Sequence, residues 1–222
     1  MIVGEQKPLE EIRATLADKK KILVAGCGAC VTICFAGGEK EVGILASTLR
    51  LANQVEGKDV TIAEQTVTRQ CEWEFVDEMA EKIGEADVIL SIACGIGVQT
   101  TAERFPGKQV LPGLNTSFLG QPTEQGVWAE TCAACGNCVL AMTGGICPVA
   151  RCSKSLLNGP CGGSQAGKCE VDPSVPCAWQ LVYDRLDTLS LQQTMETIQP
   201  PKDWSAGYRP GPRKIEREDL KI

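Results

Sequence analysis

Residues 21–42 read KILVAGCGACVTICFAGGEKEV, and this stretch decides the fold. It opens with a short apolar run at 21–25, typical of a buried strand, which leads directly into a turn of glycines and cysteines. Behind the turn, the spacing of Val42 and Leu45 predicts a helix over residues 39–53. A strand that leads straight into a helix is the first half of a β-α-β unit, in which successive strands run parallel.

The same alternation of strand and helix continues to about residue 120. Three further strands are predicted at 59–64 (DVTIAE), 87–93 (DVILSIA) and 108–111, with additional helices at 8–18 and 72–83. Such alternation predicts parallel strands joined by right-handed crossovers. Residues 1–120 are therefore expected to form a small Rossmann-like α/β domain, whose strand order the sequence does not give.

The composition changes near residue 121. From there to residue 177 the chain is dense in cysteine and glycine and has little periodicity, so metal rather than an apolar core is expected to hold it together. A helix is predicted over 178–197, which completes a cysteine-rich domain at 121–198. The fold class is thus α/β, a Rossmann-like parallel sheet domain followed by a metal-binding segment, a C-terminal helix and an extended tail.

The predicted tail, residues 199–222, combines prolines and charges with a few large apolar residues. Its four prolines, at 200, 201, 210 and 212, exclude regular structure along its whole length. Trp204, Tyr208 and Ile215 would have little purpose on a purely solvated segment. We therefore predict that the tail wraps a partner chain, with packing against its own domain as the alternative.

Composition excludes several classes of function. The chain of 222 residues has a net charge of −6, a pI near 4.9 and 5% aromatic residues, which argues against nucleic-acid binding. No apolar run approaches the length of a membrane span, and the first residues lack the pattern of a signal peptide. A cytoplasmic location without membrane insertion is expected.

Two counts dominate the chemistry: the chain has 13 cysteines and no histidine. Cytoplasmic thiols stay reduced, so metal ligation is expected in place of disulfides. Without histidine there is no Ser-His or Cys-His catalytic pair, and no catalytic residue is predicted. Metals held by thiolates alone are zinc or iron–sulfur clusters.

Five cysteines belong to the predicted α/β domain. They are Cys27, Cys30 and Cys34 after the first strand, Cys71 after the second, and Cys94 at the end of the third. The ends of parallel strands meet at one sheet edge, so these thiols should converge on a [4Fe–4S] cluster. Four suffice: Cys27 and Cys71 compete for the place beside the other three, and Cys71 could instead be a buried apolar thiol.

The same turn allows a rival interpretation as a dinucleotide site. Gly26 and Gly28 after a strand match the start of that fingerprint, and Glu64 ends the next strand. However, Val31 occupies the third glycine position, and cysteines fill the turn. Radical-SAM chemistry is also disfavoured. Cys27, Cys30 and Cys34 are separated by two and then three residues, whereas radical-SAM enzymes have the gap of three first.

Eight cysteines belong to the second segment: Cys132, Cys135, Cys138, Cys147, Cys152, Cys161, Cys169 and Cys177. The two-residue spacing of the first three, with a later Cys147-Pro148, approximates the ferredoxin pattern, although the gap before Cys147 is longer. Eight thiols make two tetrads, paired either in sequence or interleaved. Zinc is the alternative to iron–sulfur, above all for the last four.

Several motifs carry a family resemblance. CGNC (135–138), GGICP (144–148) and LNGPCGG (157–163) resemble the cysteine-rich domain called methylenetetrahydrofolate reductase C-terminal. That domain occurs in MetV-type small subunits, and GCGACVTICFAGGEKEV (26–42) is similar to the remainder of such subunits. The resemblance covers most of the chain.

The resemblance implies a division of labour. A MetF-type flavoprotein would hold flavin and folate and reduce methylene- to methyl-tetrahydrofolate in Wood–Ljungdahl-type one-carbon metabolism. This chain would be its electron-transfer accessory subunit, with two or three [4Fe–4S] clusters and zinc as an option, and a further electron-donating protein as a second partner. A zinc-stapled assembly scaffold without a redox role is the alternative, and a nucleotide-binding oxidoreductase is a third hypothesis.

Overall fold

The computed structural model describes residues 1–205, 207 and 213–220. The chain divides into two compact units, one of residues 1–118 and 122–128 and the other of residues 119–121 and 129–222. Each unit is described by itself below.

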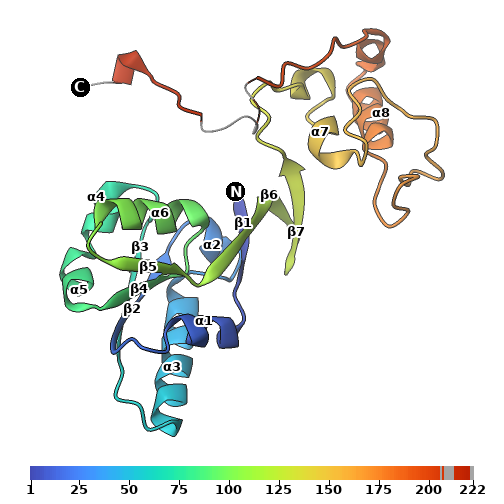
Figure 1. Cartoon of the computed structure of the whole chain (residues 1–222). Helices are drawn as coiled ribbons and strands as arrows, with labels where there is room; N and C mark the ends of the chain where they lie inside the picture. The colour runs from blue at the N-terminus through green and yellow to red at the C-terminus, as the bar shows by residue number, and fades with distance from the viewer. Residues whose placement is uncertain (206, 208–212, 221–222) are drawn as a thin grey trace. The chain divides into compact units, whose positions relative to one another are not determined.

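The N-terminal unit is built on a parallel sheet of four strands (Figure 1). The strands are β2 (Lys21–Cys27), β3 (Thr61–Val67), β4 (Val88–Ser91) and β5 (Gln109–Pro112), in the order β3-β2-β4-β5. The pairing aligns Ala25 of β2 with Ser91 of β4, and Gly26 with Thr66 of β3. All three pairings are parallel, which confirms the predicted α/β class and leaves β2 central.

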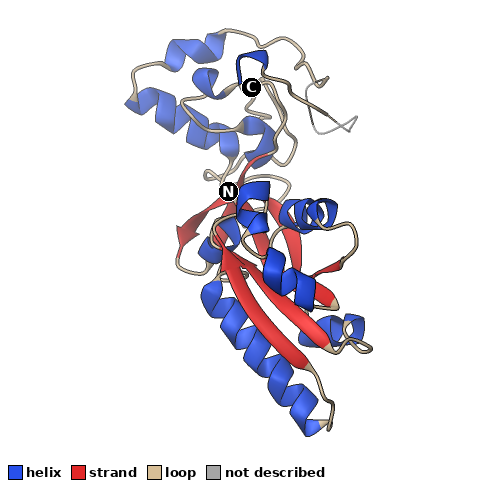
Figure 2. Cartoon of the chain, turned by 90° about the vertical axis from the view of Figure 1, so that its left-hand side faces the viewer, coloured by secondary structure: helices blue, strands red, loops and turns tan. Residues whose placement is uncertain are grey.

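Helices cover both faces of this sheet, as Figure 2 shows. The elements are α1 (Leu9–Thr15) and α3 (Glu39–Val55) on one face, and α4 (Trp73–Asp77), α5 (Ala80–Glu85) and α6 (Gly95–Arg104) on the other. Alternate residues of β2 serve the two faces, since Val24 packs with Leu45 of α3 while Leu23 packs with Met79 and Ile83. The unit therefore has an apolar core on each face of the sheet.

Three predicted helices are shorter than expected, among them α1, which covers residues 9–15 of the expected 8–18. The helix expected over 72–83 is broken into α4 and α5, because Glu78 and Met79 donate their N–H groups to carbonyls three residues back. The helix expected over 178–197 ends at Thr188, and Ser190 adopts a left-handed backbone with φ +57°. Leu189, which directly follows α8, is exposed.

A second sheet was not predicted. It is antiparallel and contains β1 (Ile2–Gln6), β6 (Leu114–Glu124) and β7 (Val127–Cys132) in the order β1-β6-β7. Its β6 sequence, LNTSFLGQPTE, alternates poorly, and only Leu114 and Gly120 in it are buried. With so little apolar patterning, the strand gives no periodic signal.

The C-terminal unit contains little regular structure. Its elements are η1 (Leu140–Met142), α7 (Pro148–Arg151), α8 (Ala178–Thr188), η2 (Gln192–Glu196) and η3 (Glu218–Leu220). Its apolar core consists of Cys177, Trp179, Val182 and Leu186, with a few half-buried neighbours. No helix among the described residues has both the length and the apolar character that a bilayer crossing requires.

The described start of the tail contacts its own unit. Asn158 and Gln199 exchange two hydrogen bonds of 2.9 and 2.7 Å, and Lys202 donates to the carbonyl of Asn137. This part of the tail thus follows the alternative interpretation, packing back on its own domain. Tyr208, Pro210 and Pro212 lie outside the described residues, whereas Ile215 is described and is 88% exposed.

Candidate metal centres

The five N-terminal cysteines lie at the carboxyl ends of three neighbouring strands. Cys27 is the last residue of β2, Cys30 opens the short helix α2 (Cys30–Ile33), and Cys34 follows that helix. Cys71 follows β3, and Cys94 precedes α6 directly after β4. The strand order β3-β2-β4 makes these three ends adjacent, as the sequence predicted.

The surroundings of the sulfurs differ. Partial desolvation raises the pKa of the Cys71 thiol, and the nearby Cys27 and Cys94 raise it further. Burial also raises the pKa of Cys34, against a hydrogen bond at the Gly4 backbone that lowers it, while Cys30 adds to the rise. The structure thus brings Cys71 near Cys27 and Cys94, and Cys34 near Cys30.

Glycines hold the cysteine turn tightly against the sheet. A Cβ atom on Gly37 would meet the Ile92 carbonyl oxygen at 1.9 Å, and one on Gly26 would meet Thr66 and Val42 side-chain atoms at 2.5 Å. The Cys27 N–H also donates to the Gly37 carbonyl at 2.9 Å. The turn is therefore fixed to its neighbours by packing and by the backbone, before any metal is considered.

A buried polar residue that the sequence analysis missed supports this edge. Gln70 is fully buried, donates to the Gly26 carbonyl at 2.9 Å and accepts from the Ser91 hydroxyl at 2.7 Å and the Thr101 hydroxyl at 3.4 Å. Its side chain therefore ties the end of β2 to β4 and α6, next to Cys71. Only its place beside a cysteine could have drawn attention to it, because a single buried glutamine creates no pattern.

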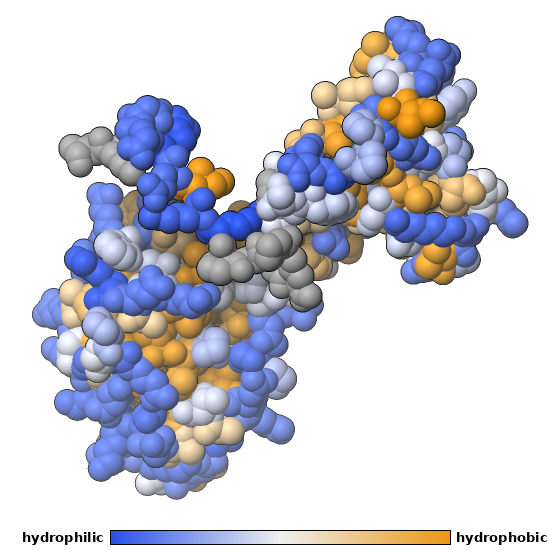
Figure 3. Space-filling view, turned by 45° about the horizontal axis from the view of Figure 1, so that its top comes forward, coloured by the Kyte–Doolittle hydropathy of each residue, from blue (hydrophilic) through white to orange (hydrophobic). Residues whose placement is uncertain are grey.

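Large apolar side chains stay exposed beside these thiols, and Figure 3 shows apolar residues gathered on this unit's visible face. We call them the apolar rim: Ile33, Phe35, Trp73 and Ile96, with exposed fractions of 51, 63, 55 and 54%. Phe35 packs edge-on against Trp128 at 6.3 Å, and Arg104 lies over the Trp73 ring at 5.5 Å. Each rim residue lies within two positions of a cysteine, and the two aromatic side chains are held in place.

The first four cysteines of the C-terminal unit occupy a glycine-rich turn region. Cys132 ends β7, and Cys147 precedes α7, whose first residue is Pro148. Between Cys132 and Cys138 the backbone turns through Ala134 and Gly136 at φ +49° and +75°, and the Ala134 N–H lies 3.4 Å from the Cys132 sulfur. Cys132 and Cys138 are exposed, while Cys135 and Cys147 are half-buried.

The last four cysteines share a small cavity, which all of Cys152, Cys161, Cys169 and Cys177 line. A hydrogen bond with the Ser153 hydroxyl, supported by backbone N–H groups, lowers the pKa of Cys169. Burial alone would raise the pKa of Cys177, but hydrogen bonds from Ser164 and two backbone N–H groups outweigh it and lower that pKa. In both cases the hydrogen bonds stabilise the thiolate relative to the thiol, and the thiolate is the form that ligates metal.

The donor chemistry of both regions suits metals held by thiolates. Within the described ranges, no three cysteine or acidic side chains already converge at ligating distances. The sulfurs nevertheless gather from separate elements, at the sheet edge and around the four-cysteine cavity, and no histidine competes with them. Cysteine-only donor sets select zinc or iron–sulfur clusters.

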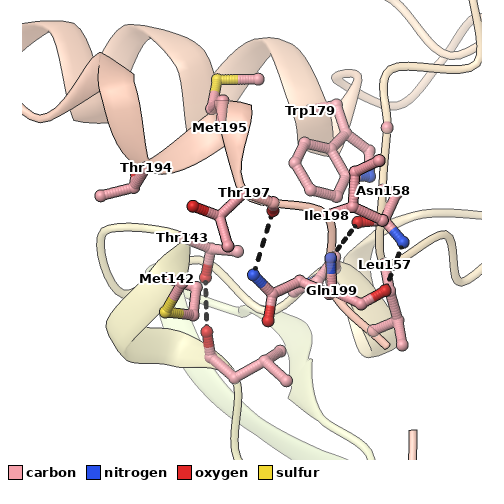
Figure 4. A pocket seen from close by; sticks show the side chains of 13 residues that line it. Met142, Thr143, Leu157, Asn158, Trp179, Thr194, Met195, Thr197, Ile198 and Gln199 are labelled. Atoms are coloured by element: carbon pink, nitrogen blue, oxygen red, sulfur yellow. Dashed lines mark hydrogen bonds between the residues drawn. The ribbon is translucent and has the colours of Figure 1, made fainter. Parts of the chain in front are cut away.

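A larger pocket in the C-terminal unit has different chemistry (Figure 4). It measures about 320 Å³ and is lined by apolar, hydroxyl and amide side chains that include Met142, Trp179, Met195 and Ile198. Its lining contains no thiol, carboxylate or amine, and the Asn158–Gln199 hydrogen bonds lie at its edge. It therefore offers neither a metal ligand nor an acid–base group.

Together, fold and thiols define a two-unit cysteine-rich α/β protein. Residues 111–205 match the family model described as "Methylene-tetrahydrofolate reductase C terminal". The family's description ties the chain to an oxidoreductase of one-carbon metabolism and confirms the resemblance found in the sequence. Neither a curated protein nor a solved structure matches the chain.

Proposed function

We propose that this chain is the iron–sulfur electron-transfer subunit of a methylenetetrahydrofolate reductase. It would pass electrons to the flavin of a separate MetF-type subunit, which would reduce methylene- to methyl-tetrahydrofolate. The observation that carries the proposal is the set of five thiols that reach one sheet edge from β2, β3 and β4. A bound [4Fe–4S] cluster would supply one-electron transfer at that edge.

The chain's own residues would position such a site. Gly37 and the Gln70 hydrogen bonds fix the strand ends, so the thiols approach from a rigid frame. Cys71 is the most exposed of the five thiols and gives the site access to the surface, and each residue of the apolar rim lies within two positions of one of these five cysteines. Exposed apolar side chains beside the site suit the docking of a protein partner.

The first four C-terminal cysteines, Cys132, Cys135, Cys138 and Cys147, are proposed to hold a second cluster. Their ferredoxin-like spacing and the open turn at Ala134 and Gly136 leave the sulfurs exposed or half-buried. The described part of the tail beyond residue 212, with its exposed Ile215, is proposed as a further contact for the partner subunit.

A nucleotide at the glycine turn is disfavoured by the packing. The space beside Gly26 is filled by Thr66 and Val42, so this glycine permits close approach of α3 rather than of a pyrophosphate. The helix that follows the turn, α2, has only four residues. A zinc-only scaffold remains the competing function, and it agrees with the same thiol sets.

Metal analysis of anaerobically purified protein separates these functions. We expect about eight irons and eight sulfides per chain, a brown colour and an EPR signal on reduction. The variants Cys94→Ser and Cys138→Ser should each lose about four irons, because each lies in a different proposed cluster site. A colourless wild-type protein that contains zinc alone would overturn the redox proposal and favour the scaffold.

A further inference from the structure

The sequence leaves open how the eight C-terminal cysteines pair, and a small cavity in the C-terminal unit bears on this. Of the eight, only the last four line it, together with apolar Leu156, Ala178 and Trp179 and polar neighbours. They come from different places: the end of α7, the start of α8 and the long loop between them. Four thiols that meet at one cavity from three parts of the chain form a natural tetrad.

The backbone around two of these sulfurs is arranged for thiolates. Cys177 directly precedes α8, and its sulfur accepts hydrogen bonds from the N–H groups two and three residues further on, at Trp179 and Gln180. The Cys169 sulfur accepts from the same two relative positions, at Val171 and Asp172. N–H groups that turn back onto a sulfur are the kind of surrounding contact that holds a metal ligand in orientation.

The size of the cavity favours the smaller of the two metal centres. Its volume is about 20 Å³, close to the space that one water molecule needs. A single zinc ion bound through sulfurs about 2.3 Å away fits such a space. A [4Fe–4S] cubane brings eight inorganic atoms and would require the lining of the cavity to move further apart.

The surroundings of the cavity also suit a charged centre. Four thiolates around one Zn²⁺ leave a net negative charge, and Lys154, which lines the cavity and pairs with Glu170, provides a nearby cation. The loop between Cys152 and Cys177 has only the isolated bridges Gln165–Lys168 and Lys168–Pro176 as sheet structure. Because this loop has so few backbone hydrogen bonds, a bound metal ion would be needed to stabilise it.

We infer that Cys152, Cys161, Cys169 and Cys177 form one tetrahedral site for a single zinc ion, which fastens the loop to the start of α8. The site is structural, since all four ligand positions are filled by the chain. The inference rests on the proposed function only for the premise that the cysteines of this unit bind metal, and it adds which four act together and with which ion.

The test is metal analysis of the full-length chain and of two matched variants. Wild type should contain about one zinc per chain in addition to iron. Cys169→Ser should lose this zinc and keep its iron, whereas Cys135→Ser should lose about four irons and keep the zinc. If wild type holds no zinc, or if Cys169→Ser loses iron instead, the inference is wrong.

Cobalt gives a second readout that does not depend on a variant that folds. Wild-type chain produced with Co²⁺ in place of zinc should show the sulfur-to-cobalt charge-transfer absorption and strong visible bands of a tetrahedral thiolate site. Absence of those bands overturns the inference even if iron is present. A chain with one zinc and no iron would instead overturn the proposed function and leave this inference standing.

Discussion

The two units of this chain differ in the size of the apolar core that accompanies their thiols. In the N-terminal unit five thiols lie at the edge of a sheet whose two faces are covered by apolar cores that include Val24, Leu45, Leu23 and Met79. In the C-terminal unit, which carries eight thiols, the main apolar cluster among the described residues consists of Cys177, Trp179, Val182 and Leu186, and one of these is itself a thiol. We therefore expect the first unit to fold without metal and the second to depend on bound metal.

The comparison shows that a high cysteine count has two different meanings in one chain. At the sheet edge, the fold comes first and brings the thiols together, as the Gln70 hydrogen bonds and the contact of Gly37 with Ile92 indicate. Around the four-cysteine cavity, the thiols are part of what brings the chain together. Removal of metal should therefore destabilise mainly the C-terminal unit, and truncation of a core side chain in the sheet should destabilise mainly the N-terminal unit.

Removal of all metal should give the largest effect. Prolonged treatment with a strong chelator under reducing conditions should unfold residues 129–200, because that unit loses its cross-links. Amide hydrogen exchange should then show full loss of protection there, while β2, β4 and α3 remain protected. Equal loss of protection in both units would break the comparison.

The reverse perturbation is Leu23→Ala. Leu23 is fully buried in β2, so the truncation should lower the free energy of unfolding of the N-terminal unit by about 2–5 kcal/mol. Denaturant titration followed by tryptophan fluorescence, to which Trp73 and Trp128 of this unit contribute, can measure this. Zinc content should stay at the wild-type level, and a parallel loss of zinc would show that the two units fold as one.

Gln70→Leu tests the sheet edge more gently. The substitution leaves the Gly26 carbonyl and the Ser91 hydroxyl without their buried partner, which should cost about 1–3 kcal/mol of stability. It should also reduce the iron retained near Cys71 under mild oxidation, with the C-terminal metals unaffected. The control is Gln99→Leu, whose side chain is exposed and bonds only within its own helix. If the two variants have the same stability and retain the same amount of iron, Gln70 does not support the site.

The smallest effect concerns partner docking. Ile96→Asp, in the apolar rim, should weaken association with a MetF-type flavoprotein about tenfold, since it places a charge in the proposed contact. Leu51→Asp, equally exposed but near the far end of α3, should leave association unchanged. Surface plasmon resonance can measure the affinity of both variants for the flavoprotein, provided that each variant retains the wild-type metal content. Equal weakening by the two variants would contradict docking at the rim.

The sequence predicts the elements that have a regular pattern of apolar residues. The strands β2, β3, β4 and β5 follow from apolar runs such as KILVA, and the convergence of cysteines from three strand ends follows from parallel topology. It cannot predict β6, whose polar NTS segment resembles a loop, or the buried role of Gln70. The grouping of the last four cysteines depends on how an irregular loop folds back, and no periodicity describes that.

The dispersed origin of the N-terminal thiols has a consequence for biosynthesis. Cys27, Cys30 and Cys34 leave the ribosome long before Cys94, and their common edge is complete only when β4 has been added beside β2. During synthesis, a nascent fragment that ends before Cys94 does not offer the full set of thiol ligands. A cluster would therefore be delivered to an already folded domain, by a carrier that approaches the surface where Cys71 is exposed.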